Sequence, residues 1–156
     1  MIVTSNLGYA YFDAKKDSLV TSGWTHGASG TLFSLVRTYD SIPTKDMPEI
    51  EKLIISTYNY ILENLLTKNY SLATGTCGNL FALKYANKIV TSLDPELASK
   101  AMKMIQKITL GDIFASTDFS KTFLHPSLFT GIAGLPVTLM YLIDDDQNIL
   151  NILNLE

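Results

Sequence analysis

The chain has 156 residues, of which 47% are hydrophobic and 17% are charged, and its net charge at pH 7 is −3. This length predicts one domain, and the composition supports a sizeable core and excludes a disordered segment. The negative charge argues against nucleic acid and against anionic membrane surfaces as partners. The single cysteine, Cys77, excludes an internal disulfide. Together with the lack of a predicted signal peptide or membrane span, it predicts a cytoplasmic protein.

The predicted elements begin with a helix over 29–39, because two earlier stretches of alternating residues, 1–3 and 9–12, are too short to predict strands. A second helix is predicted over 48–66. Its apolar residues recur at intervals of three and four and form one stripe of an amphipathic helix: Ile50, Leu53, Ile54, Tyr58, Ile61, Leu62 and Leu65.

Three more helices are predicted further along the chain. One covers 77–93, and the next begins at Asp94-Pro95-Glu96, which supplies an N-cap, a proline at the first helical position and an acidic first turn. That helix is expected to end at Gly111. A long polar loop over 112–127 then leads to a last helix over 132–143, and loops of this length often line functional sites.

The first, third and fifth of these helices begin at one pattern, which is glycine, any residue, a small residue and glycine: Gly27-Ala28-Ser29-Gly30, Gly75-Thr76-Cys77-Gly78 and Gly131-Ile132-Ala133-Gly134. The first glycines are 48 and 56 residues apart, which is typical of stacked helical units that bury their apolar faces against their neighbours. Glycines three residues apart share a helix face and allow another backbone to approach, and the first glycine can also adopt a positive φ. Three such helices predict N-termini that converge on one shared site.

The three motifs and their flanks resemble the last three repeats of the lanthionine synthetase C-like family, which includes the lantibiotic cyclases. The resemblance runs from Ser22 to Leu142 and rests on the segments 23–30, 72–80 and 128–135. It implies an all-α fold, a partial α,α-toroid in which inner helices opened by glycine motifs are wrapped by outer helices. The resemblance also implies that residues 1–156 form a single domain, corresponding to the C-terminal part of the family's toroid.

The resemblance also concerns a metal. In the family, two cysteines and a histidine hold a zinc ion that activates a peptide thiol for addition to dehydroalanine or dehydrobutyrine. Zinc stabilises a thiolate at neutral pH, and a catalytic zinc needs three protein ligands and an open position. The resemblance assigns the three ligand positions to Thr25, Ala73 and Thr74, none of which is cysteine or histidine. We therefore expect no zinc and no other cofactor.

Both histidines are candidate catalytic residues, because an imidazole titrates near neutral pH and can act as a general base. His26 lies within the first motif segment, and His125 lies in the long loop, where a solvated or loop-bracing role is the alternative. Cys77 is either a small buried thiol or a reactive thiol at a helix N-terminus. The expected binding surface consists of Trp24, Thr25, His26, Ala73, Thr74, Cys77, His125 and Phe129.

Retained motifs without the zinc ligands favour an accessory module that binds a peptide or a biosynthetic partner in lanthipeptide-type biosynthesis. One alternative is a split lanthionine cyclase completed by a complementary chain, and another is a structural helical-repeat protein unrelated to lanthipeptides. Catalytic activity is left open by the sequence. A partial ring exposes the flanks of its first and last repeats, so we expect association with a second copy or a complementary chain. A fragment of a longer gene product is the alternative.

Overall fold

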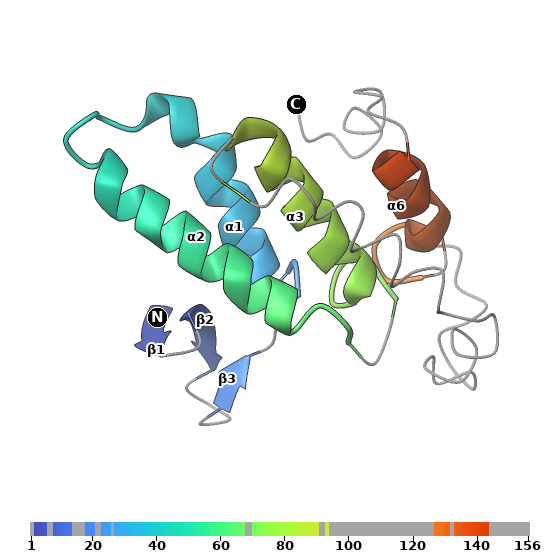
Figure 1. The fold of residues 1–156 in the computed structure, drawn as a ribbon. Helices are drawn as coiled ribbons and strands as arrows, with labels where there is room; N and C mark the ends of the chain where they lie inside the picture. The colour runs from blue at the N-terminus through green and yellow to red at the C-terminus, as the bar shows by residue number, and fades with distance from the viewer. Residues whose placement is uncertain are drawn as a thin grey trace.

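The computed structural model describes residues 2–5, 8–13, 18–20, 23–25, 27–67, 70–90, 93, 127–131 and 133–143. The first part of the chain is a three-stranded antiparallel sheet, at the lower left of Figure 1. Its strands, in the order β1-β2-β3, are β1 Ile2–Ser5, β2 Gly8–Asp13 and β3 Ser18–Val20. In the register, Tyr11 lies opposite Ile2 on one side and opposite Val20 on the other.

This sheet corrects the prediction of an all-α fold. The two stretches judged too short to predict strands, 1–3 and 9–12, overlap β1 and β2. A strand of four to six residues has almost no measurable period, and its stability depends on pairing with neighbours, which a pattern along one segment does not reveal.

The remaining described elements are helical, as predicted. They are α1 Ala28–Arg37, the 3-10 helix η1 Tyr39–Ser41, α2 Met47–Glu63, α3 Thr76–Ile89 and α6 Gly134–Ile143. The four α-helices correspond to those expected over 29–39, 48–66, 77–93 and 132–143. The helix predicted from Asp94 to Gly111, and the loop after it up to residue 126, lie outside the described residues.

The three helices that begin at glycine motifs form one layer. α1 contacts α3, α3 contacts α6, and the three run in the same direction in Figure 1. α2 packs against both α1 and α3, and β2 contacts α2 and α1. The described part therefore contains a layer of three helices opened by glycine motifs, with one further helix, α2, packed across two of them.

α2 shows how its sequence determines its place. The predicted stripe is its inward face, and Ile54, Tyr58 and Ile61 are buried. The helix ends at Glu63, and its C-cap is Asn64, whose side-chain amide donates to the carbonyl of Tyr60 at 2.9 Å. Leu65, just beyond this end, is also buried. The apolar stripe thus continues to Leu65, two residues beyond the last helical residue, Glu63.

An aromatic cluster fills the space between α1, α3 and α6. The rings of Phe33 and Tyr85 have centroids 4.5 Å apart, and those of Phe81 and Tyr141 stack at 4.3 Å. Trp24 contacts both phenylalanines, at 4.7 Å from Phe33 and 5.4 Å from Phe81. Aromatic pairs at these separations add stability beyond the area that they bury.

Candidate functional site

In the first two motifs the first glycine is the N-cap of its helix, whereas α6 begins at the second glycine of the third motif, Gly134. Gly27 has φ −147° and Gly75 has φ −113°, which are ordinary extended conformations. The positive φ that a first glycine can adopt is therefore not used at these two positions. Any residue can adopt this backbone, so conformational freedom does not explain the glycines there.

The second glycine allows a close backbone contact, as the motif spacing predicted. A Cβ placed on Gly30 would lie 2.0 Å from the carbonyl oxygen of Trp24, and one on Gly78 would lie 2.1 Å from that of Leu72. On Gly134 it would lie 2.6 Å from that of Leu128. In each case the carbonyl belongs to the residue six positions earlier. The three motifs therefore form the same folded unit, a turn that packs directly on the first turn of its own helix.

The turns of the second and third units also share a hydroxyl pair that the sequence analysis missed. Ser71 Oγ accepts from the backbone N–H of Thr74 at 3.2 Å, and Ser127 Oγ accepts from that of Thr130 at 3.3 Å. The hydroxyls of each pair lie 3.1 Å apart. The signal was present as Ser-Leu-x-Thr-Gly at 71–75 and 127–131, because serine two or three residues before an N–H is typical of a local turn.

Backbone hydrogen bonds join the three turns into one line. The N–H of Thr25 donates to the carbonyl of Ala73 at 3.0 Å, and the N–H of Ala73 donates to the carbonyl of Phe129 at 2.8 Å. These residues occupy the same position in their three units. The turns therefore meet at one end of the inner helices, and we call Thr25, Ala73 and Phe129 the turn line.

Two of the positions that the resemblance assigns to zinc ligands, Thr25 and Ala73, lie on this line and the third, Thr74, follows Ala73, but their side chains do not fit a zinc ion. The hydroxyl of Thr25 donates to the Ala73 carbonyl at 3.3 Å, and Ala73 offers only a buried methyl group. The hydroxyl of Thr74 is paired with Ser71. Zinc favours thiolate, imidazole and carboxylate donors. Among the described residues, no three His, Cys, Asp or Glu side chains are placed to hold a metal ion.

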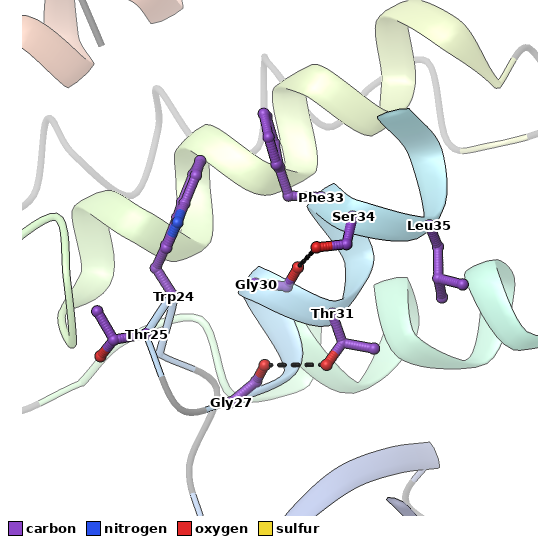
Figure 2. A pocket seen from close by; sticks show the side chains of 8 residues that line it. All are labelled: Trp24, Thr25, Gly27, Gly30, Thr31, Phe33, Ser34 and Leu35. Carbon is purple, nitrogen blue, oxygen red and sulfur yellow. Dashed lines mark hydrogen bonds between the residues drawn. The ribbon is translucent and has the colours of Figure 1, made fainter. Parts of the chain in front are cut away.

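A shallow pocket of about 750 Å³ lies beside the first unit. Figure 2 shows its lining, with Trp24 and Thr25 on the turn, Gly27 at the N-cap and the remaining residues on α1. Thr31 donates to the carbonyl of Gly27, and Ser34 donates to that of Gly30. These hydroxyls are satisfied by their own helix, so this part of the pocket wall is neutral and largely backbone.

Cys77 lies beneath the turn line. Its side chain is 1% exposed, and burial raises the pKa of its thiol to about 12, although a hydrogen bond with Thr138 of α6 lowers the pKa in part. A thiol in this state is protonated at neutral pH and is a poor nucleophile. The structural interpretation of Cys77, a small buried thiol at a helix contact, therefore fits its environment.

We expect the native protein to resist thiol reagents. At pH 8 a disulfide reagent should release no chromophore before unfolding and one equivalent after it, and Thr74→Cys, on an exposed residue, should add one equivalent that reacts at once. Because burial raises the pKa of the Cys77 thiol in the folded state, the free energy of unfolding keeps its full value below pH 9 and decreases as the pH rises from 9 towards 12. Fast reaction of the native thiol at pH 7 would contradict the burial.

The other residues of the predicted binding surface differ in how far they are exposed. Phe129 is 40% exposed, Thr25 and Thr74 are exposed, and Trp24 is half-buried, so these side chains provide accessible surface on the turn line and next to it. Ala73 contributes its backbone and little surface. The two histidine candidates, His26 and His125, lie outside the described residues.

The repeated turns, the parallel inner helices and the outer helix across them define a helical-repeat protein built from glycine-motif units. The model of the lanthionine synthetase C-like proteins matches residues 4–154, so the chain belongs to this family. No curated protein and no solved structure matches the chain. In the described part of the chain, no helix is long and apolar enough to cross a membrane.

Proposed function

We propose that this protein is a lanthionine synthetase C-like module that works without zinc and binds a peptide or a partner protein in lanthipeptide-type biosynthesis. The observation that carries the proposal is the turn line. A backbone hydrogen bond of 3.0 Å joins two of the family's ligand positions, Thr25 and Ala73, and a second of 2.8 Å joins Ala73 to Phe129, but hydroxyl and methyl groups replace the zinc donors. Such a site retains its shape and lacks the groups that would activate a thiol.

The chemistry of this surface suits an extended peptide. Exposed Phe129 provides an apolar contact, and the exposed hydroxyl oxygens of Thr25 and Thr74, which already bond within the turns, can also accept a hydrogen bond from a peptide N–H. Trp24, the only tryptophan of the chain, lies under this surface. Its indole fluorescence is therefore a reporter of peptide binding that needs no label.

The test is a titration with a dehydrated precursor peptide that carries dehydroalanine and cysteine, in buffer with a zinc chelator. We expect a saturable change in Trp24 fluorescence and no acceleration of thioether formation. Phe129→Ala should weaken binding about tenfold, because Phe129 is the proposed apolar anchor of the surface and a loss of about 1.4 kcal/mol corresponds to a factor of ten.

Lys88→Ala, on an exposed residue of α3, is the matched control and should leave the dissociation constant unchanged. Thioether formation that the protein accelerates, and that is lost in His26→Ala or His125→Ala, would contradict the proposal and favour a cyclase. No binding by the unmodified protein would also contradict it and favour a structural helical-repeat protein.

A further inference from the structure

The contacts between neighbouring units follow one rule. A Cβ on Gly78 would meet the Cβ of Trp24 at 3.3 Å, and one on Gly134 would meet the Cβ of Leu72 at 3.2 Å. Trp24 and Leu72 hold the same position in their units. The turn side chain of one unit therefore packs onto the second glycine of the next unit, and we call this pairing the unit contact.

One glycine and one turn residue are left over from this series. For Gly30, the three nearest described atoms to such a Cβ all belong to Trp24 of its own unit. Gly30 is half-buried, whereas Gly78 and Gly134 are buried. At the other end, Leu128 holds the position of Trp24 and Leu72, and no later unit among the described residues receives it. Among the described residues, Gly30 therefore receives no turn residue from another unit, and Leu128 packs on no second glycine of a later unit.

The rest of α1 shows the same difference. Ser34 is exposed, whereas the equivalent residues of the next two units, Ala82 and Thr138, are 0% and 1% exposed. Arg37 is exposed, whereas its equivalent Tyr141 is buried. In α3 and α6, the helix face that carries the equivalents of Gly30 and Ser34 is buried against the preceding unit. In α1 this face is open, and the 750 Å³ pocket lies along it (Figure 2).

We propose that the pocket at Gly30 receives the Leu128 turn of a second copy of this chain, in a head-to-tail junction that repeats the unit contact. The internal contacts specify its pairs. Because Thr25 donates to Ala73 and Ala73 to Phe129, the N–H of Phe129 in one copy meets the carbonyl of Thr25 in the other. Leu128 then packs on Gly30.

The side chains at the two ends are compatible with this junction. Within the chain, the ring of Phe33 contacts that of Tyr85 in a tilted arrangement, and the ring of Phe81 stacks on that of Tyr141. At the ends, the equivalent pair is Val137 of one copy against Arg37 of the other, so a smaller residue meets the aliphatic stem of an arginine. A junction between two different surfaces of one chain relates neighbouring copies by a rotation. If repeating this rotation returns to the first copy, the copies form a closed oligomer; otherwise they form a longer array.

The first test is the mass in solution by light scattering at micromolar concentration. We expect a mass above the 17.2 kDa of one chain, and Ser34→Arg, which fills the pocket, should reduce it to 17.2 kDa. Asn59→Arg adds the same side chain to an exposed site on α2 and should leave the mass unchanged. Far-ultraviolet circular dichroism checks that each variant is folded.

A second test identifies the two surfaces. Leu128→Ala should also be monomeric, but a mixture of Ser34→Arg and Leu128→Ala should form 1:1 pairs, since one intact junction remains. Under oxidation, Thr25→Cys and Phe129→Cys chains should cross-link when mixed, whereas Thr25→Cys with Lys45→Cys should not. The native thiol does not interfere, because Cys77 is buried.

A monomer at these concentrations would overturn the proposal, because Ser34 and Arg37 would then be the polar outer face of a terminal cap. An oligomer that Ser34→Arg leaves intact would also overturn it. This junction does not depend on peptide binding, so either proposal can fail without the other.

Discussion

Gly78→Ala should destabilise the protein by about 3 kcal/mol or more, a large share of the 5–15 kcal/mol typical of a domain. The added Cβ would lie 2.1 Å from the carbonyl oxygen of Leu72, and it would also press on Trp24. Neither neighbour is the free end of a flexible side chain, so the turn has to move away from α3. Urea unfolding monitored by circular dichroism gives the free-energy difference.

Two comparisons make this result specific. Gly134→Ala should cost less, because its Cβ would lie 2.6 Å from the Leu128 carbonyl. Lys88→Ala, on the solvent face of α3, should change the free energy of unfolding by less than about 0.5 kcal/mol. Equal losses for Gly78→Ala and Lys88→Ala would contradict the close contact between turn and helix.

The second large effect is expected for Phe81→Ala, with a loss of about 3–5 kcal/mol. Phe81 is 0% exposed and lies between the ring of Tyr141, at 4.3 Å, and that of Trp24, at 5.4 Å. Its removal leaves a cavity where three units meet, and the backbone around glycine contacts has little room to collapse into it. Thermal and urea unfolding both measure the loss.

Phe129→Ala removes the same ring from a side chain that is 40% exposed and should cost less than about 1 kcal/mol. Trp24 emission provides an independent readout, because loss of the Phe81 ring should let water reach the indole and shift its emission to the red in the folded protein. An unshifted spectrum in a folded Phe81→Ala variant would contradict the ring contact.

The helices were predictable because their signals are local. The stripe from Ile50 to Leu65 predicted α2, and the glycine pairs predicted where α1, α3 and α6 begin. The need for glycine at the second position of each motif was also predictable, since only a residue without a side chain allows a backbone carbonyl to lie so close to the helix. The family resemblance read from the same motifs agrees with the match over residues 4–154.

The rest depends on neighbours that the sequence does not specify. The sheet was missed because β1 has four residues and gains its stability from β2. The buried state of Cys77 depends on the packing of α6 against α3, and thiol chemistry alone left two interpretations open. Likewise, the difference between Gly30 and its two equivalents appears only when the units are placed side by side.

The contact between each second glycine and the carbonyl six residues earlier also determines where this chain can change in length. One residue inserted into α1 between Ala28 and Gly30 would turn the glycine about 100° around the helix and place a side chain against the turn. The segments that join the units are free of this constraint, and the first glycines are indeed 48 and 56 residues apart. Natural variants should therefore gain or lose residues between units, or gain and lose whole units, while the six-residue spacing inside each unit stays fixed.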